Sequence, residues 1–297
     1  MTDGLTRSFM VKRKPSYTPP GEFIMSRGLI GSVLIAGIAV TLAIAAGAAR
    51  GADRERSAAD ASALTSTGAC AGLPGHDALR NALAAARGQA NGGFDLDMWG
   101  AVVSRDGIVC AVAFTGSDRG KQWPGSRVIA AQKANTANAF SLPNLSLSTA
   151  NLWAAVQPGG SLYGLQHSNP VSTSAAYAGP STEFGQDDDP MVGQRIGGVN
   201  VFGGGLALYN SRKQLIGAIG VSGDTSCADH NIAWRTRQRL GLDWVPAGVS
   251  AKGDDNINYQ GQVAEPSLQH DFSHPVCKIA GVDNVSGISA ALPPTRK

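Results

Sequence analysis

The sequence has few charged and few aromatic side chains, 16% and 6% of its 297 residues. It also lacks a G-x-G-x-x-G pattern before a helix and a Walker lysine, which argues against a nucleotide-binding loop. Its glycine clusters, including Gly203 and Gly204, therefore indicate either a sheet bulge or a close approach of the backbone to a ligand. The stretch GVSGD lacks the second glycine of a G-x-S-x-G nucleophile elbow, so Ser222 is interpreted as part of a turn. The acidic run 187–189 lacks the spaced oxygens of an EF-hand loop and predicts a solvated loop.

An excess of charge of one sign is missing outside the N-terminal part. Residues 1–52 hold six Lys/Arg and two Asp/Glu, whereas residues 53–297 hold 19 and 20. The formal net charge of +3 therefore comes from the N-terminal part. The remainder offers no bulk electrostatic reason to bind nucleic acid.

Charge is absent altogether from the 22 residues 28–49, which follow Arg27. A basic start, an apolar stretch and small residues at 46–48 are typical of a secretory signal peptide. The run is also long enough to span a bilayer, so residues 1–52 are predicted to be either a cleaved signal or a membrane anchor. Both alternatives predict export to a periplasmic or extracellular location, with membrane attachment only if the segment is retained. A start at Met25 instead of Met1 would give a more compact signal.

Cysteine is scarce, with only four in the chain. An even number in an exported chain predicts two disulfides, although the sequence alone allows three pairings. We pair Cys70 with Cys110 and Cys227 with Cys277, because each bond would tie a chain end to a nearby core element.

A zinc site is the alternative for the second cysteine pair. Cys227-x-x-His230 places both side chains on one face of a helix, and His274-x-x-Cys277 supplies two further ligands. Cys227, His230, His274 and Cys277 would form an acceptable Cys₂His₂ set. The disulfide is favoured because it requires no further assumption in an exported protein.

Periodic segments predict three helices and two hairpins. The helices are expected at 76–89, 126–140 and roughly 225–240. Hairpins are expected at 98–114, around Asp-Gly, and within 197–223. Hairpins followed by helices predict an α+β domain, with helices packed on one antiparallel sheet.

The predicted domain at 70–245 is interrupted by a long insertion at 141–198. It follows a flexible tether at 53–69 and precedes a C-terminal extension at 246–297. The insertion is rich in Pro, Ser, Asn and Gly and shows little periodicity. Its aromatic residues Trp153, Tyr163 and Tyr177 favour an ordered segment that covers the sheet edge, the ligand cavity or a second subunit.

Two stretches resemble a known family. The segment RVIAAQKANTANAF (127–140) resembles the "KA-x-TA" helix of the GlcG/HbpS-type haem-binding family, also called the haem-degrading domain family. The stretch ending GAIGVSGDTSCADHNIAW (197–234) resembles that family's second hairpin and final helix, and 98–114 is similar to its first hairpin. The resemblance covers roughly 75–240 and excludes most of the insertion. The insertion, the four cysteines and the C-terminal extension depart from the family pattern.

The resemblance implies a profilin-like sandwich, assembly into a homo-oligomer, and binding of haem or a similar tetrapyrrole. The absence of C-x-x-C-H excludes a covalent c-type haem, so a haem b is expected. Among the five histidines, His76 is the first choice of axial ligand, followed by His230 and His167. Lys133, Gly203 and Gly204 are further candidates for contact with the ligand, although Lys133 would equally suit an exposed position.

The leading interpretation is an exported haem-binding or tetrapyrrole-binding protein that acts in haem sensing or redox handling. An enzyme that uses the same pocket for redox chemistry on haem or a small organic acid is the alternative. Catalysis has less support, because no nucleophile, base and orienting group can be recognised together in the sequence. A structural or partner-binding module, with the insertion as contact surface, is the third interpretation.

Overall fold

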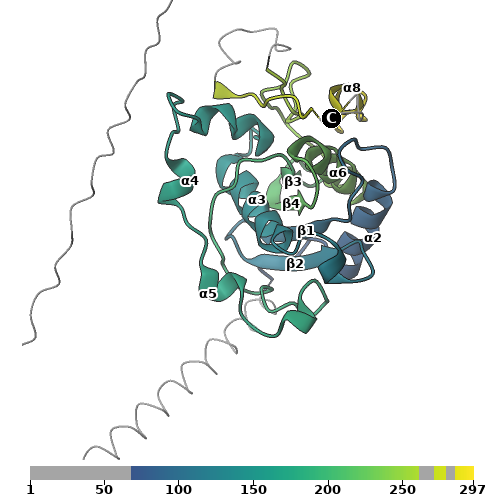
Figure 1. Cartoon of the computed structure of the whole chain (residues 1–297). Coiled ribbons are helices and arrows are strands. Elements are labelled where there is room, and N and C mark those ends of the chain that lie inside the picture. Colours follow the sequence, from purple (N-terminus) through teal and green to yellow (C-terminus); the bar gives the residue numbers. More distant parts are fainter. Residues whose placement is uncertain (1–67, 261–270, 279–284) are drawn as a thin grey trace, which may run out of the picture. The chain divides into compact units, whose positions relative to one another are not determined.

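The computed structural model describes residues 68–260, 271–278 and 285–297 (Figure 1). The predicted signal or anchor and nearly all of the predicted tether lie outside the described residues, as do His270 and two stretches of the C-terminal extension. Among the described residues, no helix combines the length and the apolar composition needed to cross a membrane.

A four-stranded antiparallel sheet forms the centre of the domain, with strand order β2-β1-β4-β3. The two predicted hairpins are present and join edge to edge through β1 and β4, where Trp99 pairs with Ser222. The α+β architecture predicted from the sequence is confirmed. The strands are β1 (Trp99–Ser104), β2 (Val109–Phe114), β3 (Gly205–Tyr209) and β4 (Leu215–Ser222).

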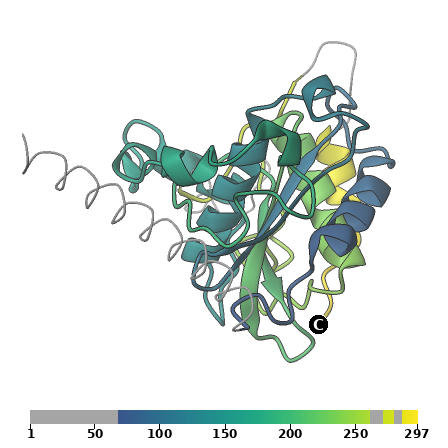
Figure 2. The ribbon, with the colours of Figure 1, turned by 90° about the horizontal axis from the view of Figure 1, so that it is seen from below.

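Two helices cover one face of the sheet: α2 (His76–Arg87) and α6 (Ser226–Arg239) (Figure 2). Large apolar side chains fill this layer because the alternate strand residues Val102, Ile219 and Val221 point toward the helices. From the helices come Leu79, Leu83, Ile232 and Trp234. The threonine before α6, Thr225, caps the helix by accepting a hydrogen bond from Ala228 N–H.

The opposite face carries α3 (Ser126–Phe140), which lies unusually close to β4. Its contact surface is rich in alanines, and Gly220 of β4 lies against them. A Cβ atom added to Gly220 would overlap the carbonyl oxygen of Ala130 and approach Ala134 N to 2.6 Å. The glycines of GAIGVSG therefore allow direct contact between helix and sheet backbones.

The insertion packs beside α3 as a series of short helical turns (Figure 1). The insertion residues Ala176, Met191 and Ile196 are apolar and join the core on the α3 face. Tyr163 and Tyr177 are 62% and 57% exposed in the single chain, whereas Trp153 is partly buried, so the two tyrosines are not core residues. The turns are η2 (Ala150–Leu152), η3 (Ala154–Val156), α4 (Leu165–Ser168), α5 (Thr173–Ala176) and η4 (Ser181–Glu183).

One residue of the acidic run anchors the insertion to α3. Asp187 and Asp188 are exposed, as expected for a solvated loop, but Asp189 is 2% exposed. Its carboxylate forms a two-pronged ion pair with Arg127, with Nε–Oδ2 at 2.8 Å, and accepts hydrogen bonds from the backbone N–H groups of Gly185 and Met191. The prediction of a solvated loop is wrong for Asp189, because a buried arginine requires a partner.

The described part of the C-terminal extension covers α6. A short helix, α8 (Val285–Ala290), packs on it, and a disulfide joins Cys227 to Cys277. A buried ion pair between Arg237 and Asp255, with Nη1–Oδ2 at 2.6 Å, attaches the same helix to the start of the extension. The extension is thus built into the domain by covalent and ionic links.

Candidate functional site

A cavity of about 410 Å³ lies between the start of β1, the loop after β2 and the insertion. We call it the aromatic cavity, because Trp99, Tyr177 and Phe184 contribute to its walls. Trp99 is fixed by a tilted contact with Phe114, with ring centroids 5.2 Å apart. No described residue accepts a hydrogen bond from its buried Nε1–H. The remaining lining residues are Asp118, Arg119, Gly120, Pro124, Gly125 and Ser181.

Arg119 supplies a cationic group to the lining of the aromatic cavity. It belongs to the short helix η1 (Arg119–Lys121), and its Nη2 donates a long hydrogen bond of 3.3 Å to Ser181 Oγ. The guanidinium therefore retains donors for an anionic ligand group. The combination of flat apolar walls and one arginine suits a planar aromatic molecule that carries a carboxylate.

A second cavity, of about 220 Å³, lies between α3 and the start of α6. We call it the polar cavity. Lys133 and Asp229 form a buried ion pair in its wall, with Nζ–Oδ2 at 2.6 Å, and Lys133 Nζ also donates to Val221 O at 3.1 Å. The other lining residues are Trp123, Ser126, Ile129, Phe202, Ser222, Asp224 and Ser226.

Burial dominates the electrostatics of the ion pair in the polar cavity. It lowers the pKa of Lys133 and raises the pKa of Asp229 to about 6, while the attraction between the two groups opposes both shifts. Lys133 is 1% exposed, so the alternative of an exposed lysine is wrong. Its contact with a ligand stays a prediction.

Gly203 and Gly204 lie where β3 meets the start of α6. A Cβ atom at Gly203 would overlap the carbonyl oxygen of Ser226, and one at Gly204 would overlap that of Val221. Close packing therefore accounts for both glycines. In addition, Gly203 N–H donates a hydrogen bond of 2.6 Å to Ser226 Oγ.

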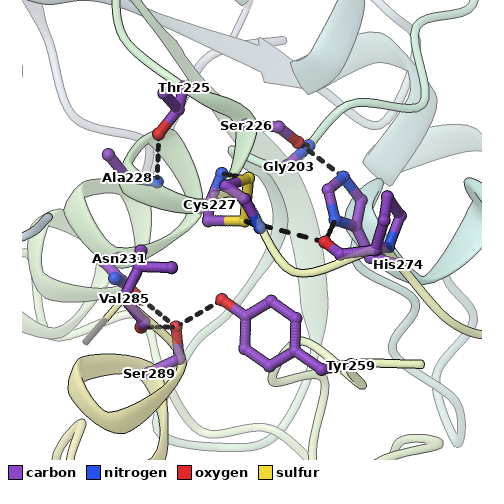
Figure 3. Close-up of a disulfide and its surroundings, with 12 residues drawn as sticks. Gly203, Thr225, Ser226, Cys227, Ala228, Asn231, Tyr259, His274, Val285 and Ser289 are labelled. Carbon is purple, nitrogen blue, oxygen red and sulfur yellow. Dashed lines mark hydrogen bonds between the residues drawn. A yellow bond between two sulfur atoms is a disulfide. The ribbon is translucent and has the colours of Figure 1, made fainter. Parts of the chain in front are cut away.

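Ser226, the first residue of α6, is hydrogen-bonded to His274 of the C-terminal extension (Figure 3). The distance from Ser226 Oγ to His274 Nε2 is 2.7 Å, and Nδ1 of the same ring lies 2.6 Å from the carbonyl oxygen of Pro275. Burial lowers the pKa of His274 to about 4, so its ring is neutral at pH 7.

Both predicted disulfides, Cys70–Cys110 and Cys227–Cys277, are present in the structure. The second bond uses the sulfurs that the zinc alternative requires. His274 does lie with the two cysteines, since their ligand atoms are within 4.8 Å of one another. His230, however, points elsewhere and interacts with Asn256 Oδ1 at 3.1 Å. The four-residue zinc set is therefore wrong.

The three histidines proposed as haem ligands lie on three different helices, α2, α6 and α4. His76 uses both ring nitrogens, at 3.0 Å from Asp77 Oδ1 and 3.0 Å from Gly185 O. His230 is fully buried in α6, and His167 is exposed on α4. Among the described residues, no histidine lines the aromatic or the polar cavity. His76 is hydrogen-bonded to Gly185, the residue after Phe184 in the wall of the aromatic cavity.

Several residues of these sites were not recognised from the sequence. Trp99, Arg119 and Phe184 carry no motif, and no signal joins them. Ser226 and His274 do have an available signal: each lies close in sequence to one cysteine of the same disulfide. A paired Ser-Cys and His-x-x-Cys places the serine and the histidine near each other.

A family model described as "Haem degrading protein HbpS-like" matches residues 75–237, more than half of the chain. The chain belongs to this HbpS-like family. The resemblance found in the sequence is thus confirmed. The HbpS-like match ends before His274 and Cys277, so the residues that cover the start of α6 lie outside it.

Several solved structures are similar to this HbpS-like chain, and no curated protein matches it. Klebsiella pneumoniae protein ORFY is 24% identical, with a TM-score of 0.37, over 55% of this chain and 86% of that one. A PduOC:heme complex is 24% identical, with a TM-score of 0.38, over 55% and 89%. A crystal structure of HbpS is 18% identical, with a TM-score of 0.35, over 56% and 86%.

Proposed function

We propose that this HbpS-like chain binds haem or a similar tetrapyrrole, without a covalent link, in the aromatic cavity. The observation that carries the proposal is the family match over residues 75–237. The cavity supports it in size, because about 410 Å³ lies within the usual range for ligand pockets of about 300–1,000 Å³.

The chemistry of the lining also suits a tetrapyrrole. Phe184 and Tyr177 offer ring surfaces for a flat macrocycle, and Arg119 can pair with a propionate. Among the lining residues, Tyr177 is the candidate axial ligand, since tyrosine is one of the side chains that bind haem iron in proteins. When bound, haem would supply an iron centre. The protein residues would orient the ring and exclude water from one of its faces.

Export and a part in haem sensing or redox handling belong to the same proposal. Two disulfides support an oxidising compartment, periplasmic or extracellular, and the signal-like residues 28–49 agree with it. We also propose that the protein is a homo-oligomer, as the family resemblance implies. Light scattering of the purified chain tests that part.

A titration with haemin tests ligand binding and its place. We expect a shifted Soret band that saturates near one haem per chain. Tyr177→Phe should alter the band, and Arg119→Ala should weaken binding about 10- to 100-fold, since a charge-assisted hydrogen bond contributes about 1.5–3 kcal/mol. Tyr163→Phe is the matched control, because Tyr163 is an exposed tyrosine of the insertion outside the cavity lining.

His76→Ala distinguishes the two ligand assignments. If this variant changes the Soret band while Tyr177→Phe does not, the sequence-based choice of His76 is right and the assignment to Tyr177 is wrong. A wild-type spectrum equal to that of free haemin would contradict the binding proposal itself.

A further inference from the structure

The Ser226–His274 pair has the hydrogen-bond directions of a nucleophile and its base. A carbonyl oxygen can only accept, so the contact with Pro275 O places the ring proton of His274 on Nδ1. Nε2 then carries a lone pair, and the Ser226 hydroxyl donates to it over 2.7 Å. The imidazole is therefore oriented to remove the proton of this hydroxyl.

Several contacts hold His274 in this position. Its backbone N–H donates to Asn258 O at 2.8 Å, and its carbonyl oxygen accepts from Gln260 N at 2.9 Å. The ring is 2% exposed and packs against Trp153, with ring centroids 5.9 Å apart. The disulfide at Cys277, three residues further on, fixes the segment to α6 (Figure 3). Catalytic side chains need such support, because a displacement of 1 Å is costly.

The surroundings of Ser226 favour negative charge. Gly203 N–H already donates to Oγ at 2.6 Å. Ser226 opens a helix of 14 residues, so the positive end of the helix dipole lies beside the hydroxyl, while the N–H groups of Cys227 and Ala228 already donate to Cys277 Sγ and Thr225 Oγ1. The Gly203 N–H and the helix dipole therefore stabilise negative charge on Oγ as its proton leaves.

The polar cavity restricts what can reach the hydroxyl. Ser226 lines it together with Trp123, Ile129 and Phe202, and its volume is about 220 Å³. An acyl group of a few carbons fits this space, whereas a long chain does not. Two carboxylates and one ammonium, from Asp224, Asp229 and Lys133, also line the cavity, which disfavours anionic substrates.

We propose that Ser226 and His274 catalyse the hydrolysis of short, uncharged carboxylic esters. Ser226 Oγ bonds to the acyl carbon while its proton passes to His274 Nε2. The ester C–O bond breaks, and the leaving oxygen keeps the electron pair and takes that proton. Water then attacks the acyl-serine with His274 again as base, which releases the carboxylic acid and restores the hydroxyl. The activity is independent of tetrapyrrole binding, because it uses another cavity and a histidine beyond the family match.

Covalent labelling with a fluorophosphonate, followed by peptide mass spectrometry, tests the nucleophile. We expect labelling of the wild-type protein at Ser226 and none in Ser226→Ala, whose fold is checked by circular dichroism. Ser168→Ala, at an exposed serine of α4, is the matched control and should label like the wild type. A wild-type protein that is unlabelled, or labelled elsewhere, overturns the proposal.

Hydrolysis of p-nitrophenyl esters tests the base and the substrate class. His274→Asn should lower kcat/KM for the acetate at least about 100-fold, since general base catalysis contributes about 10²–10⁴-fold. The wild type should cleave acetate at least about tenfold faster than decanoate, because the longer chain exceeds the cavity. Wild-type rates in Ser226→Ala, or equal rates for both esters, would contradict the assignment. If the histidine variant fails to fold, the rate of Ser226→Ala still tests the assignment of the nucleophile.

Discussion

At the scale of single residues, buried ion pairs join the helices of the domain to other segments, including the insertion and the C-terminal extension. Each described pair joins a helix of the domain to another segment: the insertion, the second helix layer or the C-terminal extension. Such pairs contribute little net stability compared with apolar replacements, but removal of one partner leaves a buried charge unpaired. The pairs are Arg127–Asp189, Lys133–Asp229 and Arg237–Asp255.

Asp189→Asn should destabilise the protein by about 3–5 kcal/mol, because Arg127 would keep its charge in a buried position without a carboxylate. Denaturant unfolding at neutral pH measures the change. Asp188→Asn is the matched control one residue away, at an exposed position, and should alter the free energy of unfolding by less than about 0.5 kcal/mol. Equal effects of the two substitutions would show that the ion pair does not anchor the insertion.

At the scale of elements, α6 is the junction between the family domain and the C-terminal extension. Its first turn carries Ser226 and Cys227, and its last turn carries Arg237. The extension is bonded to both ends of the helix, through Cys277 and Asp255. The position of His274 thus depends on the docking of the whole segment and not on its own contacts alone.

Replacement of Cys227 and Cys277 by alanine should lower the free energy of unfolding by about 4 kcal/mol, from the chain entropy of a loop closed over a sequence separation of 50 residues. Urea unfolding of the double variant measures it. The paired alanine variant of Cys70 and Cys110, with a separation of 40, should lose a similar amount. A loss below about 1 kcal/mol in the first variant would contradict a structural role of the bond.

At the scale of the whole molecule, buried histidines make the free energy of unfolding depend on pH. Burial lowers the pKa of both His230 and His274 to about 4, whereas an unfolded histidine titrates near 6.5. The unfolded chain therefore binds more protons between pH 6.5 and 4, and the free energy of unfolding falls as the pH falls through this window. Asp229, with a pKa raised to about 6, acts in the opposite direction and offsets part of the loss.

His230→Gln should reduce this acid sensitivity. Between pH 7 and pH 4, the free energy of unfolding of the wild type should fall by roughly 3 kcal/mol more than that of the variant, because the variant lacks one buried histidine that is protonated on unfolding. Denaturant unfolding at several pH values measures both curves. His167→Gln, at an exposed position, is the control and should follow the wild-type curve. Parallel curves for the wild type and His230→Gln would contradict the assignment.

Local signals in the sequence predicted the helices and the hairpins, and an even cysteine count in a chain expected to be exported predicted the disulfides, whereas long-range packing decided the sites. Helical periodicity and the Asp-Gly turn depend on residues a few positions apart, so they can be read without knowledge of the tertiary contacts. Trp99 and Phe184 meet only because the insertion returns across the sheet. No local sequence pattern predicts that course of the chain. The burial of Lys133 was left open for a related reason: α3 is covered by the sheet and by the insertion, so its polar residues are buried too.

The contact between Gly220 and Ala130 implies that the two faces of the sheet differ in their tolerance of sequence change. On the α2 and α6 face, a larger side chain at one position can be compensated by a smaller one at a neighbouring position. Substitutions there should therefore accumulate gradually. Where α3 crosses Gly220 there is no side-chain volume to exchange, and any enlargement of Gly220 meets backbone. Random mutagenesis with selection for folded protein should therefore yield many accepted variants at Leu79 or Leu83 and almost none at Gly220.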